Sequence, residues 1–166
     1  YKEDGSLNEY PVLEDNRQVN LLLNQNRDVY RNNANKFKIY LQPYIRITPL
    51  KGLSLESRLS MNLNYNTTNK FIGYGSYQFY DQAGTGALNA SKEETSQYTS
   101  ASVSNSRGWG YSWENILTYN FKISNDHEFT LTGVTTYSDS QSESSSSNAV
   151  GILSNTYYWT NLAAAV

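Results

Sequence analysis

Alternation of apolar and polar side chains over residues 36–65 is the feature that most constrains this 166-residue chain. The apolar positions are Phe37, Ile39, Leu41, Ile45 and Ile47 before the connection Pro49-Leu50-Lys51-Gly52, and Leu53, Leu55, Leu59, Met61, Leu63 and Tyr65 after it. Most residues between them are polar or charged. A period of two predicts extended strands with one apolar face and one polar face.

The alternation also predicts how these two strands pair. If Ile47 faces Leu53, the apolar rows of both strands align and Tyr44 meets Glu56. A slip of one residue would move every apolar side chain to the polar face, so the pattern itself indicates the register. Pro43 has no backbone N–H, which predicts a bulge or a locally unpaired side at that position.

The second of these strands is longer than most strands of soluble proteins, which run about 5–6 residues. Residues 53–65 number thirteen. At about 3.3 Å per residue and a tilt of about 40° they rise on the order of 33 Å, enough to span the apolar band of about 25 Å in an outer-membrane barrel. An apolar outside and a wet inside would explain both faces. The alternative is a long twisted sheet in a soluble sandwich or solenoid.

A second hairpin repeats this pattern after a long polar stretch. Its apolar face holds Tyr111, Trp113, Leu117, Tyr119, Phe121 and Ile123, then Phe129, Leu131, Gly133, Thr135 and Tyr137, with the turn at residues 124–128. In the matching register Tyr119 lies across from Gly133, so that an aromatic ring covers a bare glycine.

The predicted fold class is therefore all-β, an antiparallel transmembrane β-barrel fragment within one barrel domain. Strands are expected at about 36–48, 53–66, 111–123 and 128–138, and long loops at about 67–110 and 139–156. Short turns on one side and long loops on the other are typical of the periplasmic and extracellular ends of such barrels. The ends of the chain suggest an interior slice of a longer protein.

Composition narrows the function classes. The net charge of -2 gives no sign of a nucleic-acid partner. The chain has no cysteine, which excludes disulfides. No run of about 18 apolar residues would make a transmembrane helix, and the mean hydropathy of -0.65 does not count against a barrel, whose membrane signal lies in alternation.

Candidate chemistry is sparse, and we expect no enzyme, no cofactor and no metal site. His127 is the only histidine and stands in the predicted turn, without a second histidine or cysteine to complete a metal site. Glu93 and Glu94 are adjacent, which suits a solvated loop better than two carboxylates converging on one atom.

Binding is the better expectation. We predict contacts with a substrate or a lid protein from the aromatic loop residues Tyr74, Tyr77, Phe79, Tyr80 and Trp109, although these rings would equally serve to pack the loop. We predict that the lumen-facing charges are Arg46, Glu56, Arg58 and Glu114, whose alternative role is cross-strand pairing along a wet wall. Rings that suit an interfacial aromatic girdle are Tyr65, Tyr111, Trp113 and Tyr137.

Two motifs carry a family resemblance. The segment Ile47-Thr48-Pro49-Leu50-Lys51-Gly52-Leu53, followed by Ser57-Arg58-Leu59, resembles a hairpin of SusC-like TonB-dependent outer-membrane transporters of the Bacteroidota. The segment Trp113-Glu114-Asn115-Ile116-Leu117-Thr118-Tyr119-Asn120, followed by His127 and Leu131-Thr132-Gly133, resembles a second hairpin of that family. A weaker resemblance to the same family is found in Pro11-Val12-Leu13-Glu14 and Asn16-Arg17.

The resemblance implies a larger transporter, of which these residues would form one part. It implies a 22-stranded barrel in the cell outer membrane, a plug, a TonB-contacting segment and a SusD-like surface lipoprotein as partner. The expected function is TonB-driven uptake of oligosaccharides or peptides. Neither the plug nor the TonB-contacting segment is recognisable here, so both would belong to the remainder of the parent chain. A passive porin-like channel and a soluble secreted β-rich glycan-binding module are the alternatives.

Overall fold

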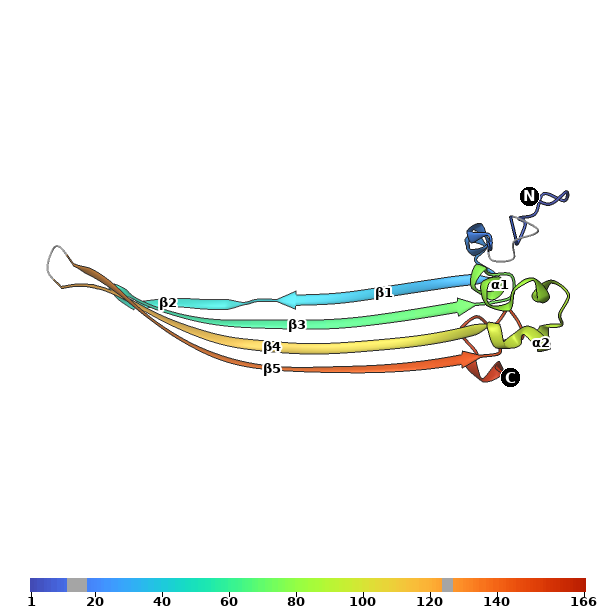
Figure 1. Cartoon of the computed structure of the whole chain (residues 1–166). Coiled ribbons are helices and arrows are strands. Elements are labelled where there is room, and N and C mark those ends of the chain that lie inside the picture. The colour runs from blue at the N-terminus through green and yellow to red at the C-terminus, as the bar shows by residue number, and fades with distance from the viewer. Residues whose placement is uncertain (12–17, 124–126) are drawn as a thin grey trace. The chain divides into compact units, whose positions relative to one another are not determined.

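The computed structural model describes residues 1–11, 18–123 and 127–166. Five strands form one sheet in the order β1-β3-β4-β5, with β2 also paired to β3 (Figure 1). Their bounds are β1 Tyr30–Leu41, β2 Tyr44–Leu50, β3 Leu53–Ile72, β4 Ser100–Lys122 and β5 Glu128–Val150. The predicted all-β class is confirmed, and the sheet is open, as expected of part of a barrel.

The contacts divide the chain into two units. Unit 1 comprises residues 1–35, 67–105 and 144–166, and unit 2 comprises residues 36–66 and 106–143. No helix in the described part of the chain is long and apolar enough to cross a membrane.

The strands of unit 2 run antiparallel. The pairing of β2 with β3 is antiparallel, and the N–H of Asn120, near the end of β4, donates 2.7 Å to the carbonyl of Gly52, just before β3. Likewise Ile123 N–H donates 3.0 Å to His127 O between the adjoining ends of β4 and β5. Antiparallel neighbours joined by short turns need no crossover, which suits consecutive strands of a barrel wall.

The first hairpin has a different register from the predicted one. Arg46 pairs with Glu56 and Ile47 with Leu55, a shift of two residues along the strand, so the predicted pairing of Ile47 with Leu53 was wrong. The cause lies at the turn, because Leu50 itself pairs with Leu53 and the pairing shifts irregularly between Ile47 and Leu50. A shift of two leaves each side chain on its predicted face.

Proline interrupts the edge of the sheet as the sequence predicts. Gln42 and Pro43 separate β1 from β2, where a single strand at about 36–48 was expected. The carbonyl of Pro43 still accepts the Leu59 N–H at 3.0 Å. Pro43 has no N–H to return to Leu59, so this hydrogen-bonded pair of residues keeps only one of its two bonds.

The second hairpin also differs in detail. A Cβ built on Gly133 would meet no atom within 4 Å, so no ring covers that glycine and the predicted Tyr119–Gly133 cover was wrong. The aromatic rings instead stack on one another, Tyr119 on Phe121 at 5.2 Å and Phe121 on Phe129 at 5.6 Å between centroids.

Both predicted long loops are shorter than expected. β3 continues to Ile72 and β4 begins at Ser100, so the connection that was predicted at 67–110 occupies residues 73–99. β5 continues to Val150 through the serine-rich segment, so the loop predicted at 139–156 was wrong over most of its length. Two expectations lie outside the described residues: most of the turn at 124–128, and the weaker family resemblance at Val12-Leu13-Glu14 and Asn16-Arg17.

Unit 1 has a small apolar core. Phe71, Ala101 and Ile152 are buried together, and Tyr158 packs its ring edge-to-face against Phe71 with centroids 5.3 Å apart. The connection between β3 and β4 also belongs to unit 1 and folds into short helices: α1 Tyr77–Ala83, η2 Thr85–Leu88, α2 Lys92–Thr95 and η3 Ser96–Tyr98. The remaining helical turns are η1 Leu21–Gln25 and η4 Leu162–Ala164.

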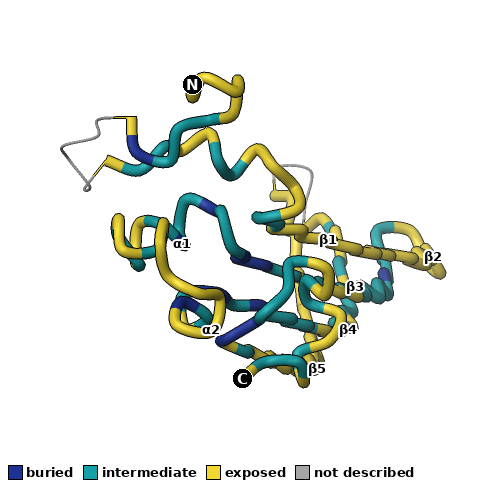
Figure 2. Tube along the Cα trace, turned by 90° about the vertical axis from the view of Figure 1, so that its right-hand side faces the viewer, coloured by how far each residue is buried: buried dark blue, intermediate teal, exposed yellow. Residues whose placement is uncertain are grey.

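Unit 2 leaves its apolar side chains exposed. Every residue of β2 is exposed, and the yellow colouring of β1 and β2 in Figure 2 marks this. On the apolar face Phe37 is 55% exposed, Ile47 54%, Leu131 62% and Tyr137 59%. The apolar residues of the chain that are fully buried, among those described, all belong to unit 1.

Candidate functional site

The polar face of unit 2 is built from alternate residues of β1, β3, β4 and β5, and β2 adds Arg46 to it. It carries Lys36, Lys38 and Tyr40 from β1, Ser60, Asn62, Asn64 and Asn66 from β3, Gly108, Gly110, Ser112 and Glu114 from β4, and Ser138 and Ser140 from β5. These residues share one face because side chains two apart on a strand point the same way. Hydroxyl and amide groups line the middle of this surface, between the charged side chains of Lys36 and Lys38 and those of Arg58 and Glu114.

Arg46, Glu56 and Arg58 form a charged cluster on this face. Glu56 is only 6% exposed and accepts hydrogen bonds from both arginines, at 2.8 Å from Arg46 Nε and 2.6 Å from Arg58 Nη2. The cluster thus holds two guanidinium groups on one carboxylate and keeps a net positive charge. Its arginines remain partly exposed, at 59% for Arg46 and 38% for Arg58.

Three of the four charged residues predicted to face the lumen are therefore brought together. Glu114 lies on the same face of β4 but makes no ion pair with a described residue. The arrangement around Glu56 suits fixed electrostatics rather than proton transfer, because two charge-assisted hydrogen bonds stabilise its ionised form.

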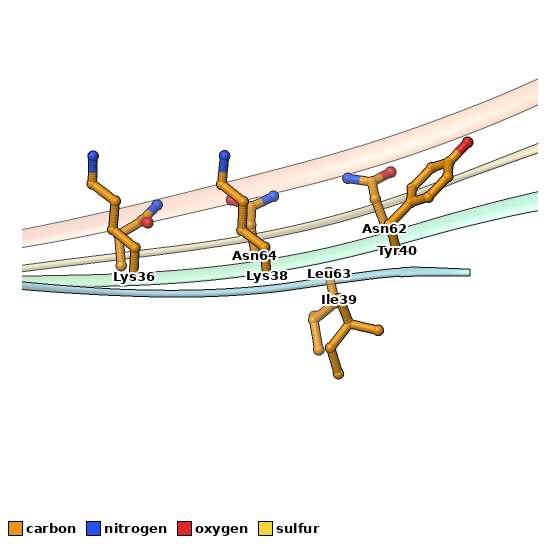
Figure 3. Close-up of a pocket in the computed structure, with 8 residues that line it drawn as sticks. Lys36, Lys38, Ile39, Tyr40, Asn62, Leu63 and Asn64 are labelled. Atoms are coloured by element: carbon orange, nitrogen blue, oxygen red, sulfur yellow. The ribbon is translucent and has the colours of Figure 1, made fainter. Parts of the chain in front are cut away.

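A groove runs along β1 and β3 on the polar face. Its lining residues are Lys36, Lys38, Ile39, Tyr40, Asn62, Leu63, Asn64 and Asn66, around a volume of about 430 Å³. Figure 3 shows both lysines, Tyr40, Asn62 and Asn64 projecting from one side of the sheet, with Ile39 and Leu63 on the other. Sequence reasoning noted some of these residues as a polar face but did not identify the groove, because it arises only when the two strands are placed in register.

Two glycines of β4 make room beside this groove. A Cβ at Gly108 would lie 3.0 Å from Asn64 Nδ2, and one at Gly110 would lie 2.9 Å from Asn62 Oδ1. Both distances are too short for an ordinary contact with a side chain. The side-chain amides of Asn62 and Asn64 therefore lie against the backbone of these two glycines, where β4 has no side chain on the polar face.

The loop aromatics of unit 1 pack against one another. Phe79 is 3% exposed and lies edge-to-face with Tyr74 and Tyr80, each 5.2 Å away between ring centroids. The Tyr74 hydroxyl donates 2.7 Å to Lys92 O, and its backbone is held by Asn155, whose amide both accepts from Tyr74 N and donates to Tyr74 O. Burial raises the pKa of both tyrosines, Tyr74 and Tyr80, so both stay neutral hydrogen-bonding groups.

The predicted contact residues thus fall into two groups. Tyr74, Tyr77, Phe79 and Tyr80 belong to unit 1, where the Tyr77 N–H is held by Asn24 at 2.9 Å. Trp109 was expected in the loop, but it stands within β4 in unit 2, 42% exposed and stacked on Tyr111 at 6.1 Å. The loop interpretation of Trp109 was wrong because β4 begins nine residues earlier, at Ser100.

Trp109 belongs to an aromatic row on the apolar face of unit 2. Tyr111 lies 5.9 Å from Tyr137 between ring centroids, and Tyr65 is 47% exposed. Next to Trp109, Arg107 forms an ion pair with Glu143, its Nε donating 2.8 Å to the carboxylate. With increasing distance from the turn between β4 and β5, this face thus carries first the aromatic rings and then the Arg107–Glu143 ion pair.

Comparisons with known proteins add one result. No protein-family model matches the chain, and no curated protein matches it. A solved structure described as "Structure of the RagAB peptide transporter" aligns with 92% of this chain at a TM-score of 0.63 and 14% identity. This chain spans about 15% of the length of that one. Identity this low establishes a likeness of fold, here to part of a transporter.

Proposed function

We propose that this chain is part of the wall of a SusC-like, TonB-dependent nutrient importer of the bacterial outer membrane. The observation that carries the proposal is the pair of opposite faces in unit 2. One face exposes large apolar side chains and the other carries amides, hydroxyls and charges. Soluble proteins rarely expose apolar patches larger than a few hundred Å², whereas a barrel wall turns such a face to lipid.

Two polar contacts on the apolar face of unit 2 support the lipid assignment, one because its two groups are paired and one because it lies at the margin of the face. Within the apolar face, the indole N–H of Trp113 donates a hydrogen bond of 2.8 Å to the Ser57 hydroxyl. Hydrocarbon offers no alternative partner to either group, so pairing them lowers the cost of placing them there. The Arg107–Glu143 ion pair lies beyond Trp109 and Tyr111, where the interfacial region would begin.

The cargo and partners follow from the resemblance and from the structural neighbour. The neighbour's description names a peptide transporter, which favours peptide over oligosaccharide as the cargo here. A SusD-like surface lipoprotein would close over the extracellular side, and TonB and a plug would act through other parts of the parent chain. The loop residues Tyr74, Tyr77 and Tyr80 would meet lid or cargo, and Phe79 would hold their loop together. The segment would bind and guide cargo, with no catalytic role and no cofactor.

The test uses the full-length parent protein in its native host. We expect it in the outer-membrane fraction, extracted only by detergent, and co-purifying with a lipoprotein. Uptake of a labelled oligopeptide should stop when the proton gradient that drives TonB is collapsed. Uptake that survives this treatment would indicate a porin-like channel, and recovery in the soluble fraction would indicate a soluble module instead.

A further inference from the structure

The groove between β1 and β3 concentrates positive charge without a matching carboxylate. The ammonium groups of Lys36 and Lys38 project together from the polar face (Figure 3). Neither lysine forms an ion pair with a residue that the structure describes. An unpaired pair of cations on a surface that faces cargo attracts anionic groups.

No acidic residue is among the described residues that line the groove. Glu114, the carboxylate of the polar face that pairs with no described residue, lies four residues beyond Gly110 on β4. Glu56 is bound by Arg46 and Arg58, and Glu143 pairs with Arg107 on the opposite, apolar face. The other residues that surround the groove on the polar face are neutral: Ser60, Asn62, Asn64, Asn66, Gly108, Gly110, Ser112, Ser138 and Ser140. The charge of the two lysines is therefore left for a ligand.

The spacing of the groove matches an extended peptide. Lys36 and Lys38 are two residues apart on one strand, so their side chains repeat at about 6.6 Å. Alternate side chains of an extended peptide repeat at the same distance. Asn62 and Asn64 offer amides that both donate and accept, as a peptide backbone requires.

We infer that this groove is a cargo subsite for extended acidic peptides, with peptide carboxylates at alternate positions on Lys36 and Lys38 and the peptide backbone on the asparagine amides. The inference rests on the proposed function, since it assigns a peptide class to the wall of the importer. The aromatic platforms that usually hold sugar rings are absent from the described groove residues except for Tyr40.

The experiment measures binding to the full-length protein in detergent with two fluorescent hexapeptides. One alternates Ser and Glu, and the other alternates Ser and Gln. We expect the acidic peptide to bind more tightly, and the variant Lys36→Gln/Lys38→Gln to weaken it by roughly tenfold while leaving the neutral peptide unchanged. Raising the salt from about 0.1 M to about 1 M should remove most of the preference, since the screening length falls from about 10 Å to about 3 Å.

A matched control removes two positive charges elsewhere in unit 2. Lys51 lies in the turn before β3, and Lys122 pairs with Glu128 at the end of β4. The variant Lys51→Gln/Lys122→Gln should bind the acidic peptide as the wild type does. If both double variants weaken binding equally, the effect is one of net charge and the subsite is wrong.

The remaining outcomes separate the two proposals. Equal affinity for the acidic and the neutral peptide, with normal peptide uptake, would overturn the subsite and leave the importer intact. Failure of peptide uptake in the host, with outer-membrane location lost, would overturn the importer. Charge reversal in Lys36→Glu/Lys38→Glu should make a Ser-Lys peptide the preferred ligand, and persistence of the acidic preference in that variant would also contradict the subsite.

Discussion

Unit 1 and unit 2 share the strands β1, β3, β4 and β5 but are stabilised in different ways. In unit 1, Phe71 and Ile152 are both 0% exposed and pack in a protein core. In unit 2, apolar side chains such as Ile45 stay exposed, at 71%. A chain can thus keep one strand continuous while its apolar side chains rely on protein in one stretch and, under our proposal, on lipid in another. The predictions below test that contrast, beginning with the largest expected effect.

Phe71→Ala should destabilise unit 1 strongly. It would leave a cavity beside Tyr158, and truncations of this kind cost about 3–5 kcal/mol. We expect faster proteolysis within residues 73–99 of the membrane-embedded protein. Phe37→Ala, which truncates an exposed ring of unit 2, is the matched control and should leave that proteolysis unchanged. Equal sensitivity in both variants would show that the two units do not differ in this way.

Leu59→Arg should destabilise the protein in a bilayer but not through loss of packing. Leu59 lies on the apolar face of β3, and an arginine facing lipid near the bilayer centre costs about 2–4 kcal/mol. Ser60→Arg, one residue on and on the polar face, should cost far less. Urea titration in lipid vesicles measures both, and a larger loss for Ser60→Arg would reverse the assignment of the faces.

Glu56→Gln should lower the unfolding temperature of the detergent-solubilised protein, because Arg46 and Arg58 would then face each other without their shared carboxylate. Glu128→Gln removes an exposed partner 3.7 Å from Lys122 and should have little effect. Heat-dependent migration on gels reports the change. No difference between the two variants would mean that the cluster contributes nothing to stability.

The smallest effect concerns α2 in unit 1. Ser91 and Glu94 form a capping box, in which hydrogen bonds from Ser91 lower the pKa of the Glu94 carboxyl. A lowered pKa means that this contribution to stability is present at neutral pH and is lost as the pH falls through the pKa in the folded state. We expect pepsin cleavage around α2 to increase as the solution is acidified, and Glu94→Gln to weaken this pH dependence.

Sequence reasoning succeeded where the two faces of a strand meet different surroundings. The alternation around Leu59 and Leu63 indicated both the strands and the faces of unit 2. It failed along residues 139–150, where serine and other polar residues occupy both faces of β5. A strand that is wet on both sides shows no alternation, so a period of two cannot reveal it. The Ser91–Glu94 capping pattern was readable from the sequence and went unused.

The site was harder to predict than the fold. The shared face identified Arg46, Glu56 and Arg58 from the sequence. The predicted register paired Glu56 with Tyr44, whereas in the structure Glu56 pairs with Arg46. This difference in register depends on the irregular pairing before Leu50, which residue types alone do not specify. The groove at Lys36 and Lys38 needed both strands in position before it could be recognised.

Pro43 has a consequence for how further strands could join this sheet. In an antiparallel strand a residue directs its N–H and its C=O to the same neighbour. Because the Pro43 carbonyl bonds to Leu59, the N–H that proline lacks would also have pointed toward β3. The missing hydrogen bond therefore lies inside the sheet, and the free edge formed by β1 and β2 loses no donor at this position, so a further strand could pair there without a gap.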